Sequence, residues 1–176
     1  MQELMVTMFF TIGLIILLVY MVMASQFESL IHPFSIMAAV PLSIAGVALA
    51  LFITGTTLSV MSFIGIMILI GVVVNNGIVL IDYVNHLRAQ GMAKTEALIQ
   101  GGVTRLRPIL MTTLTTILAL LPMALNKGEG AELFAPISIT LFGGLLVSTL
   151  LTLVIVPSLY SLIDGGSQWI RKKLHR

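Results

Sequence analysis

The run VMSFIGIMILIGVVVNNGIVLI, from Val60 to Ile81, indicates the class of structure that this chain adopts. It contains no charged residue, and its polar side chains are Ser62, Asn75 and Asn76. A helix of about 20 apolar residues crosses a hydrocarbon core roughly 30 Å thick, because each residue adds about 1.5 Å. The run is therefore predicted to be a membrane-spanning helix.

Apolar segments of similar length lie on both sides of this run. Charged residues make up 9% of the 176 residues and hydrophobic residues 58%, whereas a soluble globular domain carries about 25% charged residues. The sequence predicts an all-α membrane protein with a single transmembrane domain over residues 1–176. Its five helices are expected at about Met5–Ala24, Phe34–Ile53, Val60–Ile81, Pro108–Leu125 and Pro136–Ile163.

The residue types that carry most enzyme chemistry are absent or badly placed. The chain has no cysteine, which excludes disulfides, thiolate metal sites and a cysteine nucleophile. His32, His86 and His175 show no metal-ligand spacing, and we find no phosphate-binding loop or hydrolytic constellation. We therefore expect no catalytic activity, no cofactor and no metal site. The basic residues form no patch among aromatic residues, so we expect membrane lipid around the chain and no nucleic-acid partner.

The basic residues are distributed unevenly among the loops. Of the 9 lysines and arginines, all except Lys127 lie between Tyr83 and Arg107 or after Ile163. Five helices place these two regions on one side of the membrane, and the positive-inside rule makes that side the cytoplasm. The N-terminus is then outside and the C-terminus cytoplasmic. Because nothing precedes the first helix to carry it across, we expect that residue 1 is not the start of the natural protein.

The cytosolic connector, residues 83–107, contains a helical pattern of its own. Apolar residues recur near helical spacing among polar ones around Ala93 to Leu98, which favours a short amphipathic cytosolic helix on the membrane surface. The glycine pair at residues 101–102 is expected to interrupt this helix. Pro108 then opens the next span, since proline is tolerated in the first turn of a helix.

Polar residues stand at matched positions on the third and fourth predicted spans. Asn75 and Asp82 are seven positions apart and share a face of one helix, as Arg105 and Thr112 do on the next. The two helices run in opposite directions from a shared cytosolic boundary. Asn75 and Thr112 should therefore face each other at one depth, about 10 Å from a cytosolic layer in which Asp82 faces Arg105.

Two interpretations of these polar layers stay open from the residues alone. In the first they are structural, since threonine and asparagine hydrogen bonds hold membrane helices together for about 0.6 kcal/mol each. In the second they line a proton or ion pathway, because polar residues at the midplane mark such routes. Asp82 is the only carboxylate in or beside the second to fourth spans, and it lies at the edge. If protons move here, another segment must supply the titrating group.

Four stretches of the chain resemble the resistance-nodulation-division permeases, specifically their hydrophobic and amphiphilic efflux branch. VYMVMASQFES (Val19–Ser29), with the prolines at 33 and 41, is similar to the eighth and ninth membrane helices of that family. GVVVNNGIVLIDY (Gly71–Tyr83) resembles the tenth helix and RLRPILMTT (Arg105–Thr113) the eleventh. GGLLVSTLLTLVIVPSLY (Gly143–Tyr160) resembles the twelfth. The resemblance covers essentially the whole chain in the family's own order.

The resemblance implies a complete fold of twelve membrane helices in two similar halves with two periplasmic porter regions. It also implies a homotrimer in the bacterial inner membrane, a periplasmic adaptor, an outer-membrane channel, and proton-driven export of drugs or other amphiphilic solutes. Asn75 falls where well-studied drug pumps place a lysine, and Asn76 matches the asparagine that follows it. Arg105 and Thr112 match the arginine and threonine associated with the proton relay. Their partner would be an acidic pair on the family's fourth helix.

The chain is therefore expected to be one part of a larger transporter. The porter regions and the first seven helices of the family have no counterpart in these residues, so substrate pocket and proton acceptor are missing. We expect the C-terminal membrane segment of a proton-driven efflux transporter, either a fragment or a split half that needs the N-terminal half as its partner. The alternative is a non-transporting membrane protein, a remnant or small regulator, that packs against a full-length permease.

Overall fold

A computed structural model of the chain describes residues 2–28, 31–126, 128 and 130–174. For residues 2, 31, 32, 153, 154, 156, 157 and 159–174 it describes the backbone alone. Ser29, Lys127, His175 and Arg176, which entered the sequence predictions, lie outside the described residues. The helices are α1 (Gln2–Phe27), α2 (Ile31–Met37), α3 (Ala39–Thr54), α4 (Val60–Ala89), α5 (Lys94–Leu125) and α6 (Ala131–Leu174).

Local sequence explains several helix ends. α4 begins after Ser59, whose hydroxyl accepts a hydrogen bond from the Ser62 N–H at 3.3 Å, while the Ser62 hydroxyl accepts one from the Ser59 N–H at 3.4 Å. This capping box satisfies N–H groups that have no partner within the helix. α3 ends at Thr54 and is followed by Gly55, where φ is 66°. Glycine adopts this left-handed conformation without a steric penalty and so terminates the helix.

Five helical stretches are long and apolar enough to cross a membrane, and the described residues contain no strand. This confirms the predicted all-α membrane protein with five spans. The second span combines α2 and α3, which are separated at Ala38. The stretches are Glu3–Phe27, Pro33–Thr54, Val60–Ala89, Lys94–Leu125 and Ala131–Thr152.

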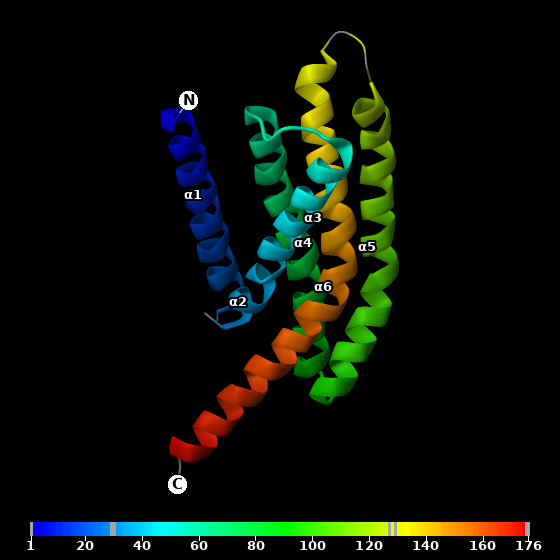
Figure 1. Ribbon diagram of the computed structural model, residues 1–176. Helices are drawn as coiled ribbons and strands as arrows, with labels where there is room; N and C mark the ends of the chain where they lie inside the picture. Colours follow the sequence, from blue (N-terminus) through cyan, green and yellow to red (C-terminus); the bar gives the residue numbers. More distant parts are fainter. Residues whose placement is uncertain (1, 29–30, 127, 129, 175–176) are drawn as a thin grey trace.

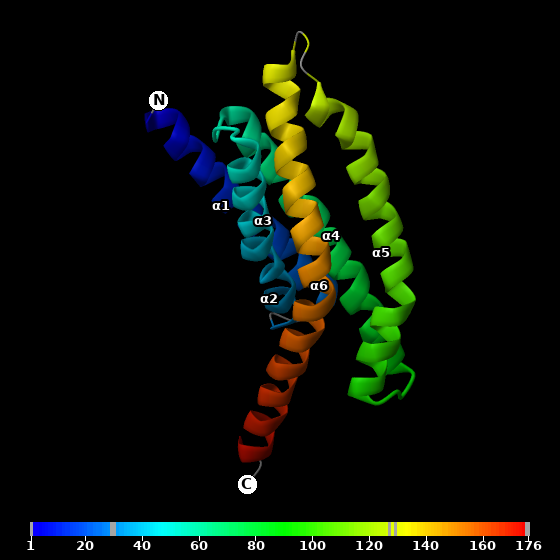
Figure 2. The same cartoon turned by 45° about the vertical axis from the view of Figure 1, so that its right-hand side comes forward.

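α6 lies at the centre of the bundle, where it packs against α3, α4 and α5 (Figure 1). α3 and α5 flank it, and the rotated view places α4 behind it (Figure 2). α1 stands to one side and, among the described elements, contacts α2 and α4 alone. The start of α1, the loop after α3 and the loop after α5 share one end of the bundle, which we call the upper end.

Glycines allow the central helices to approach closely. A Cβ atom added at Gly46 of α3 would lie 2.7 Å from the carbonyl oxygen of Gly143 in α6. One added at Gly65 of α4 would lie 2.9 Å from Cβ of Thr140, also in α6. Membrane helices gain little from burying apolar side chains against one another, because lipid is equally apolar, so close backbone approach at small residues supplies much of their packing energy.

The connector between the third and fourth spans differs from its predicted form. α4 continues to Ala89, and residues 94–107 are the first turns of α5 instead of a separate surface helix. The glycine pair does not interrupt the helix: a Cβ at Gly101 would lie 2.6 Å from Cγ2 of Val84, so the absence of a side chain lets α5 pack on α4. Ala97 is fully buried on the same side. The apolar face of this segment therefore covers protein, and Pro108 lies inside the helix.

The remaining boundaries also shift. α6 runs from Ala131 to Leu174 and is longer at both ends than the predicted Pro136–Ile163. α4 begins where predicted, at Val60, but extends beyond the predicted end at Ile81. Polar and charged residues near these ends masked the continuation of the helices, because hydropathy marks the part of a helix inside lipid and not its full length.

Candidate functional site

The polar stripe, Asn75 and Asp82, lies along an exposed face of α4. Both residues are exposed, and Gly71, one turn earlier on this face, has no atom of another element within 4 Å of a built Cβ position. Seven residues of an α-helix turn through almost two full revolutions, which places the two side chains in line. Most of the rest of α4 is packed, with Val73, Leu80 and Ile81 almost fully buried. The predicted shared face therefore exists and is open.

Thr112 is exposed on α5, but its hydroxyl does not reach across to α4. Its Oγ1 donates to the carbonyl oxygens of Pro108 at 3.2 Å and Ile109 at 3.0 Å, both one turn earlier in its own helix. The predicted contact between Asn75 and Thr112 is thus replaced by a hydrogen bond within α5. Threonine in a helix commonly satisfies its hydroxyl in this way when no partner helix offers an acceptor.

Arg105 faces α4 but does not pair with Asp82, contrary to the prediction. Its guanidinium carbon lies 4.7 Å from the centre of the Tyr83 ring, which is cation–π geometry. One residue along a helix is a rotation of about 100°, so Tyr83 faces α5 while Asp82 stays on the exposed face. Arg105 Nε is buried without a hydrogen-bond partner among the described residues. The predicted pair of Asp82 with Arg105 is therefore replaced by an arginine stacked on an aromatic ring, with one N–H unsatisfied.

The predicted site residues thus fall into two groups. Asn75, Asp82 and Thr112 are exposed, and Asn76 is half-buried on the side of α4 that also carries Tyr83. Arg105 is half-buried between α4 and α5. Neither group forms a closed site with other residues that the structure describes.

Sequence reasoning missed the polar contact that joins α5 to α6. Thr113 Oγ1 and Thr149 Oγ1 are 3.2 Å apart, and the two residues are buried. Threonines occupy positions 112, 113, 115 and 116 of the sequence, and this pattern does not reveal which of them faces another helix. The signal that points to Thr113 is Ile109, one turn earlier and also buried, which marks the packed side of α5.

The described residues include no group of three or more histidines, cysteines, aspartates or glutamates that could hold a metal ion. Chemically, the site offers an amide, a carboxylate and the N–H of a guanidinium. These groups can donate and accept hydrogen bonds with residues outside this chain.

Comparison with known proteins identifies the family. The family model described as the AcrB/AcrD/AcrF family matches residues 1–164. The chain is 44% identical over 149 residues to the swarming motility protein SwrC of Bacillus subtilis, and this match covers 84% of the chain and 14% of SwrC.

Two solved structures agree with this match. The chain superposes on one crystal form of a heavy metal efflux pump with a TM-score of 0.78 and 37% sequence identity. The match covers 85% of this chain and 15% of the pump. In another crystal form the TM-score is 0.68 at 41% identity, covering 76% and 13%. The chain thus spans about a seventh of these relatives. Its order of membrane helices and its match over most of its length make it a member of the AcrB/AcrD/AcrF family of resistance-nodulation-division permeases.

Proposed function

We propose that this chain is the C-terminal membrane segment of a proton-driven efflux transporter and acts together with the N-terminal half of the permease. The observation that carries the proposal is the exposed polar stripe on α4. An amide or carboxylate facing lipid is costly unless it meets a polar partner. The rest of α4 is well packed, so we infer that a helix of a partner packs against the exposed stripe.

The position of Arg105 supports a relay at this surface. A buried N–H of a cation without an acceptor costs free energy, so a guanidinium that reorients toward an acceptor on the N-terminal half would gain stability. Carboxylates on helices of the N-terminal half would satisfy this guanidinium and, separately, the amide of Asn75, which lies in a layer about 10 Å away. A carboxylate is also the titrating group that proton transfer needs and that the midplane of this chain lacks. Asn76 and Thr112 would complete the polar surroundings of that group.

Family membership and the distribution of lysines and arginines support the proposed setting. We propose that the chain lies in the bacterial inner membrane, with its N-terminus outside and its C-terminus in the cytoplasm. The complete permease is proposed to be a homotrimer that works with a periplasmic adaptor and an outer-membrane channel. It is a transporter without enzymatic activity or a cofactor. Drugs or other amphiphilic solutes are the proposed substrates, and the similarity to a heavy metal efflux pump makes metal ions the competing substrate class.

The test joins this chain to the rest of a permease. The chain is co-expressed with the upstream half in cells that lack their own efflux pumps, and resistance is measured against amphiphilic drugs and, separately, metal salts. We expect resistance that disappears when the proton gradient is collapsed with an ionophore. Arg105→Ala should abolish it. Arg107→Ala is the matched control, because Arg107 lies two residues away on the same helix and is exposed.

Two outcomes would contradict the proposal. Full resistance with Arg105→Ala would remove the role given to this arginine. Resistance that survives collapse of the proton gradient would exclude proton coupling. The alternative function, a non-transporting protein that packs against a full-length permease, predicts no resistance in the joined system. It predicts instead that the chain co-purifies with an intact permease, and that substitutions at Asn75 or Asp82 abolish this association.

A further inference from the structure

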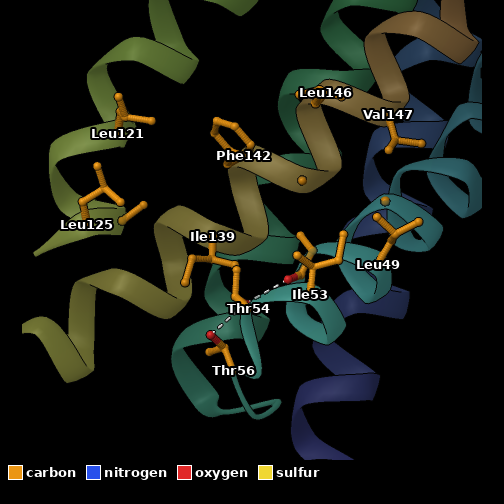
Figure 3. A pocket seen from close by; sticks show the side chains of 14 residues that line it. Leu49, Ile53, Thr54, Thr56, Leu121, Leu125, Ile139, Phe142, Leu146 and Val147 are labelled. Atoms are coloured by element: carbon orange, nitrogen blue, oxygen red, sulfur yellow. Dashed lines mark hydrogen bonds between the residues drawn. The ribbon is translucent and has the colours of Figure 1, made fainter.

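A groove between α3, α5 and α6 is separate from the polar stripe. Its volume is about 650 Å³, which lies within the range of about 300–1,000 Å³ typical of small-molecule sites. Leu121 and Leu125 of α5 lie across from Ile139 and Phe142 of α6 (Figure 3). Among the residues that the structure describes, no charged residue and no residue of α4 lines it.

The shape of the groove follows from unequal packing around α6. On one side α3 meets α6 closely at Gly46 and Gly143, and these glycines form part of the groove's lining. On the other side the second half of α5 is packed loosely, since Leu121 is 40% exposed and Leu125 69% exposed. A tight contact beside a loose one leaves an elongated space bordered by large apolar side chains.

The polar atoms of the groove belong mainly to two threonines near the end of α3. Thr54 Oγ1 donates to the carbonyl oxygen of Ala50 at 2.8 Å and lies 3.0 Å from Thr56 Oγ1. Thr56 follows Gly55, in the loop at the upper end of the bundle. The groove is thus apolar along its length, with two hydroxyls at the end near the membrane boundary. This distribution fits a molecule with a long apolar tail and a polar end.

We propose that the groove holds one acyl chain of a membrane phospholipid. All three helices that line it are membrane spans, so lipid is the solvent in contact with it. The described lining offers no counter-charge to a charged solute, whereas it suits an apolar chain. The polar stripe lies on α4, which contributes no described residue to the groove, so the groove and the stripe are separate surfaces.

The full chain in vesicles provides the test. Vesicles of phosphatidylethanolamine and phosphatidylglycerol contain a small fraction of phosphatidylethanolamine with a diazirine in the middle of one acyl chain. After illumination, mass spectrometry locates the crosslinks. Bulk lipid labels each side chain in proportion to its exposure. Leu118 of α5 is 65% exposed and does not line the groove, so bulk lipid would label it more than Leu121, which is 40% exposed. An acyl chain bound in the groove would instead label Leu121 more than Leu118, and would also label Phe142 strongly.

A filling substitution adds a second measurement. Ala124→Phe places a ring in the groove and should remove most of the labelling at Phe142 while leaving that at Leu118 unchanged. Ala119→Phe is the matched control, because Ala119 is on the same helix, is exposed and does not line the groove. It should leave the labelling pattern as it was.

Three results would overturn the proposal. Labelling that simply follows exposure would identify ordinary bulk lipid. Labelling at Phe142 that survives Ala124→Phe would place the reacting chain outside the groove. Loss of that labelling when the upstream half is co-expressed would show that protein, and not lipid, occupies the groove in the complete permease. None of these results depends on whether the permease transports.

Discussion

α1 and α4 are equally apolar in sequence, yet α4 is packed inside the bundle and α1 lies at its side. Their most apolar windows have the same mean hydropathy, but none of the residues in the α1 window is buried, against half of those in α4. α4 contacts α1, α2, α3, α5 and α6, whereas α1 contacts α2 and α4. Hydropathy therefore places a helix in the membrane without assigning it a position among the other helices.

The difference lies in the small residues. A Cβ at Gly65 or Gly77 of α4 would clash with a neighbouring helix, and Gly144 of α6 admits the side chain of Leu69. Gly13 of α1 has no atom within 4 Å of a built Cβ position. Lipid competes with protein for an apolar side chain, so membrane helices associate where their surfaces fit closely. α4 has such surfaces on several sides, and α1 has few.

The largest loss of stability is expected when a side chain is introduced at a glycine contact of α4. Gly65→Leu would press on Cβ of Thr140 and on the carbonyl oxygen of Ile137, 3.1 Å from a built Cβ, and neither can move without shifting α6. Overpacking of this kind costs about 1–3 kcal/mol, and we expect the upper end of that range. Equilibrium unfolding in mixed micelles with rising SDS measures the loss.

Gly13→Leu in α1 is the matched control for that substitution. It should leave the free energy of unfolding unchanged, because no other element surrounds Gly13. Equal losses for the two substitutions would mean that α1 is packed as closely as α4.

A smaller effect is expected where α1 does touch the bundle. The rings of Phe9 and Phe63 meet edge to face, with centroids 5.4 Å apart. Phe9→Ala removes this contact, which is worth about 1 kcal/mol, and should broaden the distance distribution between spin labels on α1 and α4. Phe10→Ala is the control, since Phe10 is 73% exposed. An unchanged distribution for Phe9→Ala would show that other contacts fix α1.

The smallest effect concerns the hydrogen bond between α5 and α6. Thr113→Val removes the hydroxyl that lies 3.2 Å from Thr149 Oγ1, and interhelical hydrogen bonds in membranes are worth about 0.6 kcal/mol. The same SDS titration should resolve this loss. Thr115→Val should cost less, because the exposed Thr115 bonds to the carbonyl oxygen of Met111 in its own helix. A larger loss for Thr115→Val would indicate a partner for α5 on its exposed side.

The prediction that Asn75 and Asp82 share a face of α4 was correct, whereas the predictions of pairs between α4 and α5 were wrong. The spacing of Asn75 and Asp82 predicts a common face, and both are exposed on one face of α4. The predicted pairing of Asp82 with Arg105 is wrong because the rotation of α4 presents Tyr83 to α5 instead. Spacing within a helix follows from its fixed geometry. The rotation of one helix against another depends on side chains of both and is not visible in either sequence segment.

The functional roles of Asn75, Asn76, Asp82, Arg105 and Thr112 stay predictions. The sequence identified them by residue type, depth and family resemblance. The structure adds where they lie: a stripe open to a partner, and an arginine held under a tyrosine ring with one N–H unsatisfied.

The number of membrane spans and the helical class followed from the sequence, because transfer into lipid depends on the composition of each segment alone. Tertiary structure was needed to show that α6 is central, that α1 stands apart, that Gly101 is a packing contact and not a helix break, and that a groove opens beside α5. These features arise from steric fit between segments distant in sequence. That fit, and not hydropathy, determines how helices associate in a solvent as apolar as they are.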